Sequence, residues 1–341
     1  MTTTPAAPVP DAADRPATVE ARRKPPGTVG PADRIFSLVS RASGGTVLAI
    51  MGTVGLFLAV QAAPALREAG WKFLTDKEWE PGAGDFGIAA ILFGTIAIGV
   101  VAVSIALMFS VATALYISEY APARLQRTFI SMVDLMAAVP SVVYGLWGVF
   151  FLQEHAVGLA QWLSVYLGWI PLFNVPNRDP NDPLASLTDF KSSTFMAGVV
   201  VAMMVTPIAS SVMREAFSQA PAGEREGAFA LGATRWGMIR DVVLPFGRGA
   251  IIGGTMLGLG RALGETITVA MIISPIYEIQ WQVLEKGGIS VSSLIALRYG
   301  EAEGISLSAL FAAGLALFLM TMAVNFAASV IVSRSRSGAA S

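Results

Sequence analysis

The sequence predicts an all-α integral membrane protein with six transmembrane helices, and two observations support this prediction. Apolar residues make up 54% of the 341 residues and charged residues only 14%, whereas soluble domains carry about 25% charged residues. Six apolar runs also reach the length of about 20 residues that a helix needs to cross a bilayer. We therefore expect lipid to be the main solvent of this chain.

The six predicted spans are residues 45–65, 87–117, 129–152, 194–213, 249–275 and 306–332. The second is longer than a straight crossing needs, so we expect it to tilt or to project from the membrane. Residues 1–40 are rich in Pro, Ala, Thr and charge and predict a disordered cytoplasmic tail. Residues 41–335 form the predicted transmembrane domain, and residues 336–341 form a short C-terminal tail.

Basic residues indicate the orientation, because lysine and arginine accumulate in cytoplasmic loops. With both termini inside, 15 of the 23 basic residues lie on the cytoplasmic side and Arg261 lies within a span. The seven on the other side are Arg67, Lys72, Lys77, Arg178, Lys191, Lys286 and Arg298. The orientation with both termini in the cytoplasm is the consistent one.

Several functions are disfavoured by what the sequence lacks. It has no cysteine, a single histidine (His155) and no Gly-x4-Gly-Lys-Ser/Thr run for binding nucleotide phosphates. We therefore expect no metal site, no catalytic residue and no cofactor bound by this chain, and we expect no nucleic-acid partner.

The loop between the fourth and fifth predicted spans, residues 217–247, contains a helix–glycine–helix pattern. Ala228 to Leu231 can form a short helix that Gly232 ends, and Thr234 can cap a second helix that runs to Leu244. Pro245 is expected to break the chain before the next span. By pattern alone, this loop fits a protein-docking element and an interfacial amphipathic connector equally well.

Spacing in this loop separates the two readings, because it resembles the EAA loop of ABC importer permeases, Glu-Ala-Ala-x3-Gly-x9-Ile-x-Leu-Pro. The residues at the matching intervals are Glu226, Gly227, Ala228, Gly232, Val242, Leu244 and Pro245. Gly227 stands where the family usually has Ala, and Val242 where it often has Ile. The resemblance implies the type I importer permease fold and makes residues 217–247 a coupling loop that sits in a groove of a separate ATPase subunit.

Three other stretches resemble the phosphate importer permeases, PstC and PstA. They are residues 117–122 (ISEYAP), 139–148 (VPSVVYGLWG) and 258–266 (GLGRALGET). The segment from Trp71 to Ile88 is more similar to PstC than to PstA. The resemblance implies a PstA-like second permease subunit, two PstB-like ATPase subunits that use ATP and Mg, and a PstS-like extracytoplasmic phosphate-binding protein, all in a bacterial plasma (inner) membrane.

Two charged residues lie inside the fifth predicted span. Arg261 is near its middle, where a charge costs about 2.5–3.5 kcal/mol to insert, and Glu265 follows four residues later on the same helical face. They can neutralise each other, or they can belong to a translocation pathway in which Arg261 contacts an oxyanion and Glu265 restrains Arg261 and accepts from protonated phosphate. Charged residues of this motif are implicated in transport in the family that the sequence resembles.

The same predicted span carries two small-residue pairs, Gly254 with Gly258 and Gly260 with Gly264. Glycines at this spacing let membrane helices approach closely, so we interpret them as packing positions.

The leading hypothesis is a non-catalytic permease subunit of an ATP-driven phosphate importer, which works by alternating access. A permease for another oxyanion, such as molybdate or sulfate, is the first alternative, because the loop pattern is shared among importers. A remote alternative is an intramembrane enzyme that uses Glu265 or Asp134 as acid or base.

Overall fold

The computed structural model describes residues 30–175 and 188–336. Residues from Val54 onward form one compact unit, and those before it form another. Helix α1 (Pro31–Ala69) begins in the first unit and ends in the second. Pro31 and Asp33 suit the first turn of a helix, where an N–H needs no partner and negative charge is favoured. The predicted disordered tail is therefore wrong over residues 31–40, while residues 1–29 and 337–341 lie outside the described residues.

Six helical segments in the described ranges are long and apolar enough to cross a membrane, which confirms the predicted fold class. They are Pro31–Ala69, Ala89–Tyr120, Ser141–Leu167, Thr194–Ser218, Arg235–Leu263 and Gly304–Val330. Their parts are α1; α3 (Ala89–Leu115) with the π turn η3 (Tyr116–Tyr120); α5 (Ser141–Trp147), the π turn η4 (Gly148–Leu152) and α6 (Gln153–Leu167); α8 (Thr194–Ser218); α10 (Arg235–Met238), the π turn η5 (Ile239–Val243) and α11 (Leu244–Leu263); and α14 (Gly304–Arg336).

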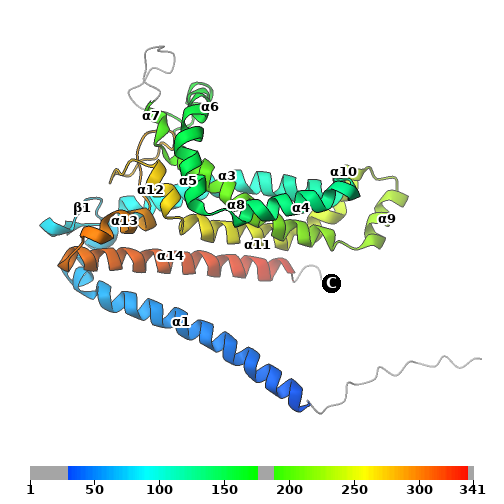
Figure 1. The fold of residues 1–341 in the computed structure, drawn as a ribbon, viewed down its shortest axis with the longest axis horizontal. Coiled ribbons are helices and arrows are strands. Elements are labelled where there is room, and N and C mark those ends of the chain that lie inside the picture. The colour runs from blue at the N-terminus through cyan, green and yellow to red at the C-terminus, as the bar shows by residue number, and fades with distance from the viewer. Residues whose placement is uncertain (1–29, 176–187, 337–341) are drawn as a thin grey trace, which may run out of the picture. The chain divides into compact units, whose positions relative to one another are not determined.

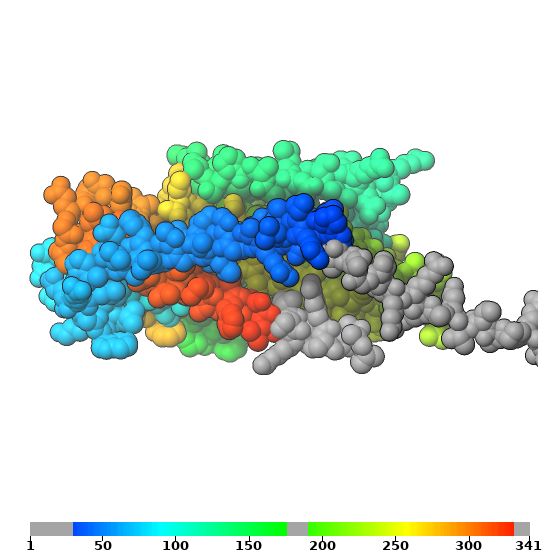
Figure 2. Space-filling view, turned by 90° about the horizontal axis from the view of Figure 1, so that it is seen from below, coloured from blue at the N-terminus to red at the C-terminus, as the bar shows by residue number. Residues whose placement is uncertain are grey.

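Helix α8 is the central packing element of the unit that starts at Val54. It contacts α3, α11 and the additional helix α4 (Ala123–Ala138), and α11 also contacts α3 and α14. These helices run side by side, with α9 (Ala222–Ala230) and α10 at one end (Figure 1). The opposite end carries α13 (Val291–Arg298) and the segment after α1, seen in Figure 2 as orange and cyan surfaces.

Short elements build the end opposite to α9. They are α2 (Lys72–Thr75), β1 (Trp79–Glu80), η2 (Pro81–Ala83), β2 (Asp85–Phe86), α7 (Thr188–Lys191), α12 (Ile267–Ile272), α13 and η6 (Tyr299–Glu301). The strands pair antiparallel, with Trp79 opposite Phe86. Edge-to-face contacts join the Phe86 ring to Phe73 at 6.3 Å and to Trp79 at 6.5 Å between ring centroids. These rings fix the segment that follows α1 by apolar burial.

A proline inside α1 is accommodated by a serine from α14. Pro64 has no N–H to donate within the helix. The Ser308 Oγ donates to the Gln61 carbonyl at 2.6 Å and accepts from the Ala65 N–H at 3.3 Å. One hydroxyl therefore satisfies backbone groups beside Pro64, which are costly to leave unpaired away from water.

The third predicted span, residues 129–152, is wrong as a single helix. Helix α4 ends at Ala138, and Pro140 directly precedes α5. Proline disfavours the helical conformation at the residue before it, and Val139 has the extended φ and ψ of −66° and 130°. Helix α4 runs alongside α8, whereas α5 and α6 run in a different direction from α4 (Figure 1).

The fifth predicted span, residues 249–275, is also interrupted. The helix starts earlier than predicted, at Arg235, and α11 ends at Leu263. Gly264, Glu265 and Thr266 separate it from α12. Pro245 does not break the chain, contrary to the prediction. It occupies the first turn of α11, directly after π turn η5, whose wider turn accommodates a residue without an N–H.

Candidate functional site

The coupling loop, residues 217–247, folds as two short helices joined by a glycine turn. Gly232 adopts a φ of +87°, the left-handed conformation that glycine tolerates best. Its N–H donates to the Phe229 carbonyl, and the Ala233 N–H donates to Ala228, so the end of α9 is a Schellman motif. The Thr234 Oγ1 accepts from the Gly237 N–H at 3.1 Å and caps α10. The predicted glycine stop and threonine cap are confirmed.

Some residues of the loop pattern are exposed, and others pack at the ends of the spans. Glu226, Gly227, Gly232 and Pro245 are exposed, and Ala228 packs against a buried cluster at the ends of the spans. Leu244 is half-buried against that cluster, and Val242 is also half-buried. Exposed apolar side chains surround the glycine turn: Phe229, Trp236 and Leu231, of which Leu231 is 92% exposed. Several large apolar side chains exposed within one short loop are consistent with a protein interface.

A partly buried ion pair anchors the loop to the second span, and the sequence did not predict it. Arg225 Nη2 lies 3.1 Å from Glu119 Oε1, and Nη1 donates to Oε2 at 3.3 Å. The Oε1 contact lacks hydrogen-bond geometry and is an ion-pair contact. The two residues are 106 positions apart in the sequence. The only sequence signal was that each carries a charge beside an apolar segment.

Glycines of α11 bring it against α8. A Cβ on Gly258 would lie 2.5 Å from Val205 Cγ1, and one on Gly254 would lie 3.1 Å from the Ala209 carbonyl oxygen. Gly260 faces Asn325 of α14 instead, and near Gly264 are only carbonyl oxygens of its own helix. The two glycine pairs therefore have different surroundings.

A cavity of about 650 Å³ lies mainly between α11 and α14, and we call it the α11–α14 cavity. It is lined by Ile208, Met256, Leu257, Gly260, Arg261, Gly264, Gly314, Leu317, Phe318, Thr321 and Asn325. Among these described residues, Arg261 is the one with a charge. Arg261 is exposed in this cavity and follows three residues after Gly258, which packs against Val205 near the midpoint of α8, so the arginine lies near the middle of the span.

The predicted Arg261–Glu265 pair is not formed in the described part of the chain. Arg261 is exposed to the cavity, whereas Glu265 is 7% exposed and lies beyond the helix end, so the four-residue spacing no longer places them on one face. Glu265 Oε1 accepts from the Thr268 Oγ1 at 2.7 Å and from the Thr268 N–H at 3.2 Å. Thr268 Oγ1 also lies 3.0 Å from the Ser141 carbonyl, and the Glu265 carbonyl accepts from Ser292. Glu265 therefore fixes the break between α11 and α12.

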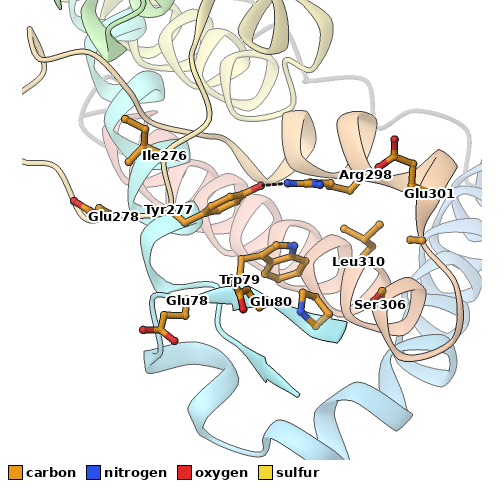
Figure 3. A pocket seen from close by; sticks show the side chains of 12 residues that line it. Glu78, Trp79, Glu80, Ile276, Tyr277, Glu278, Arg298, Glu301, Ser306 and Leu310 are labelled. Atoms are coloured by element: carbon orange, nitrogen blue, oxygen red, sulfur yellow. Dashed lines mark hydrogen bonds between the residues drawn. The ribbon is translucent and has the colours of Figure 1, made fainter. Parts of the chain in front are cut away.

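A second cleft of about 780 Å³ opens at the end opposite to the coupling loop (Figure 3). Its lining holds one arginine, Arg298, and four glutamates: Glu78, Glu80, Glu278 and Glu301. Arg298 Nη2 donates to the Tyr277 hydroxyl at 3.4 Å, which raises the pKa of the guanidinium further above its ordinary value. The excess of carboxylates repels a small anion. This cleft is unsuited to bind an oxyanion.

Together the interrupted fifth span, the cavity that contains Arg261 and the helical loop fit one class of protein, the helical membrane permeases. Residues 106–337 match the family described as "Binding-protein-dependent transport system inner membrane component". The chain therefore belongs to this family, and within it to the PstC permeases, as the following relatives show.

The chain is 39% identical over 305 residues to the "Phosphate transport system permease protein PstC" of Mycobacterium leprae, covering 88% of this chain and 92% of that protein. It is 38% identical over 304 residues to "PstC 2" of Mycobacterium tuberculosis, with 88% and 91% covered. The PstC protein of Xylella fastidiosa is 36% identical, with 89% and 91% covered. These relatives confirm the resemblance seen in the sequence.

Two solved structures share the fold. A bacterial ABC transporter involved in the import of alginate has a TM-score of 0.53 at 16% identity, covering 88% of this chain and 99% of that one. The inward-facing MetNI methionine ABC transporter has a TM-score of 0.50 at 14% identity, with 73% and 95% covered. The fold is that of a type I ABC importer permease, and the chain is a multi-pass membrane protein.

Proposed function

We propose that this chain is the permease subunit of an ATP-driven phosphate importer in a bacterial plasma membrane, with both termini in the cytoplasm. It forms half of the translocation pathway, and a PstA-like subunit forms the other half. Two PstB-like subunits bind ATP and Mg, and a PstS-like protein delivers phosphate from outside. The chain itself binds no cofactor and works by binding and conformational change.

The observation that carries the phosphate proposal is Arg261 in the α11–α14 cavity. A permanent positive charge near the middle of a membrane span is costly unless it serves a polar path or an anion. Arg261 forms no ion pair among the described residues, so its guanidinium remains available to a ligand. Its planar donors match the oxygens of a tetrahedral anion.

Asn325 supplies a second polar group to the same cavity from α14. Its amide lies 3.5–4.0 Å from the position of a Cβ on Gly260, the residue directly before Arg261. An amide both donates and accepts hydrogen bonds, so it can accept from a protonated phosphate oxygen. Fully ionised sulfate has no such proton to donate. Arg261 then attracts the anion, and Asn325 helps to select its protonation state.

Glu265 contributes to this pathway by positioning the end of α11. It holds the chain at the end of α11 through Thr268, and the break that it fixes begins three residues after Arg261. Its role is therefore to set where the arginine-bearing helix stops. This replaces the direct restraint of Arg261 that the sequence suggested.

The coupling loop supplies the contact with the ATPase subunit. Its short helices present Phe229, Leu231 and Trp236 beside the glycine turn, and Glu226 adds a charge at the rim. A groove that covers these apolar side chains removes them from water, which provides the main driving force of association.

Phosphate uptake into vesicles that contain the complete complex tests the proposal. We expect Arg261→Gln to reduce uptake at least about 10-fold, because hydrogen bonds to charged groups contribute about 1.5–3 kcal/mol. Arg261→Lys should retain part of the uptake, since it keeps the charge but loses the planar fork. Excess arsenate should compete with phosphate, and sulfate and molybdate should not.

Two results count against the proposal. Wild-type uptake by Arg261→Gln, in complexes assembled to normal amounts, would remove Arg261 from the pathway. Stronger competition by sulfate or molybdate than by arsenate would favour a permease for another oxyanion.

A further inference from the structure

The Glu119–Arg225 pair connects α9 of the coupling loop to two spans at once. Glu119 lies in π turn η3, at the end of the second span, and its side chain is 4% exposed. Arg225 Nη2 also donates to the Phe217 carbonyl at 2.6 Å, at the end of α8. One guanidinium therefore contacts the ends of the second and fourth spans from the first helix of the loop.

Helix α9 has little else to hold it in place. It contains no fully buried residue, and its apolar Phe229 is half-exposed. Ala228 makes its packing contact with the buried cluster at the span ends. The charged contacts of Arg225 are therefore the strongest attachment of α9, since hydrogen bonds between charged groups exceed neutral ones.

The second loop helix reaches the same π turn. The Arg235 guanidinium of α10 lies 5.2 Å from the centroid of the Tyr120 ring, in cation–π geometry. Phe217 in turn packs so tightly on α11 that a Cβ on Gly247 would overlap its ring. Both helices of the loop and three spans meet around η3 and Phe217.

An ion pair with one buried partner contributes little to stability by itself. Packed apolar residues often stabilise such a site as well, because charges lose hydration on burial. Charges do, however, fix a direction and a distance between the elements that carry them. π turns often mark functional sites within helices.

We infer that Glu119 and Arg225 are positioning residues that form a strut, which transmits displacement of α9 to the second and fourth spans. This inference rests on the proposed function, in which an ATPase subunit moves the coupling loop. The strut stays closed through the transport cycle. Without it, the ATPase subunits move α9 while the spans remain behind.

The test measures phosphate taken up per ATP hydrolysed by the complete complex in vesicles. We expect Glu119→Gln to lower this ratio about 10-fold, with ATP hydrolysis retained, because substitutions in a coupling network change coupling by up to about this amount. The matched control is Glu215→Gln. Glu215 pairs with Arg214 at 4.0 Å, but its side chain is 63% exposed, and its loss should leave the ratio unchanged.

Arg225→Lys is the second variant. Lysine keeps the charge but is a single point donor that cannot hold both Glu119 and the Phe217 carbonyl. Arg225→Lys should therefore also lower the amount of phosphate taken up per ATP hydrolysed. It provides the test if Glu119→Gln prevents assembly of the complex. If neither variant assembles, or if ATP hydrolysis falls in proportion to uptake, the pair is only structural and the inference is wrong.

A chemical cross-link gives the rescue experiment. The chain contains no cysteine, so Glu119→Cys with Arg225→Cys places the sole thiol pair in this subunit. A short bifunctional thiol reagent should restore the uptake ratio of this double variant, because a strut needs only a fixed connection. Loss of the remaining uptake on cross-linking would mean that the contact must open. If wild-type complexes take up no phosphate, the proposed function fails instead, so the two failures are distinguishable.

Discussion

The contact between α11 and α8 at Gly258 gives a prediction whose size follows from the geometry. In Gly258→Ala, the new Cβ would lie 2.5 Å from Val205 Cγ1. Carbon atoms in contact are normally about 3.5–4.0 Å apart. The two helices must therefore separate by about 1 Å, or Val205 must leave its rotamer, and overpacking of this kind costs about 1–3 kcal/mol.

Gly253→Ala on the same helix is the matched control. No atom lies within 4 Å of the Cβ position at Gly253. Both substitutions gain the higher helix propensity of alanine, about 1 kcal/mol. We therefore expect Gly253→Ala to raise the free energy of unfolding slightly, and Gly258→Ala to be less stable than this control by about 1–3 kcal/mol.

Reversible unfolding by SDS titration in mixed micelles measures this difference. The double variant Gly258→Ala with Val205→Ala removes the obstructing Cγ1 and should recover part of the loss, as a favourable coupling energy in a double-mutant cycle. Equal stability of Gly258→Ala and Gly253→Ala, or an additive double variant, would show that α8 and α11 are not packed as closely as described.

Three further changes have defined outcomes. Leu231→Ser removes an exposed apolar side chain and should weaken co-purification of an ATPase subunit. The melting temperature of the isolated chain should stay unchanged. Weaker binding together with a lower melting temperature would contradict this prediction. Ser308→Ala leaves backbone groups beside Pro64 without their partner. It should lower the free energy of unfolding in the micelle titration by about 0.6–2 kcal/mol. The control Ser329→Ala, on the same helix, should leave this free energy unchanged. Asn325→Leu should raise the KM for phosphate about 10-fold, with ATP hydrolysis retained, as expected for the loss of a hydrogen bond to a charged ligand; an unchanged KM would remove Asn325 from the pathway.

The sequence predicts the spans best where one uninterrupted helix carries the whole apolar run. A helix is one of the few structures that satisfies every backbone group in a bilayer, so a long apolar run has little choice. Residues 194–213 and 306–332 accordingly fall within α8 and α14. The apolar run 129–152 crosses Pro140, and hydropathy does not register that a proline ends one helix and starts another.

The candidate site was harder to predict because it depends on one helix end. The pairing of Arg261 with Glu265 assumes a continuous helix, and a four-residue spacing loses its meaning where α11 stops at Leu263. The predicted glycine stop at Gly232 and threonine cap at Thr234 are confirmed, because both depend only on residues close by in the sequence. The Glu119–Arg225 contact is set by tertiary packing, which a single sequence does not show.

Helix α3 joins the two functional regions physically. It ends in η3, which carries Glu119, and its Gly99 lies against α11 beside the cavity arginine. A Cβ on Gly99 would be 2.9 Å from Leu263 Cδ2 and 3.4 Å from Leu259 Cδ1, so there is no free space at this contact. Packed interfaces of this kind shift between discrete arrangements and do not deform continuously. A displacement that reaches α3 through Glu119 must therefore rearrange Leu259 and Leu263, which lie two residues before and two residues after Arg261.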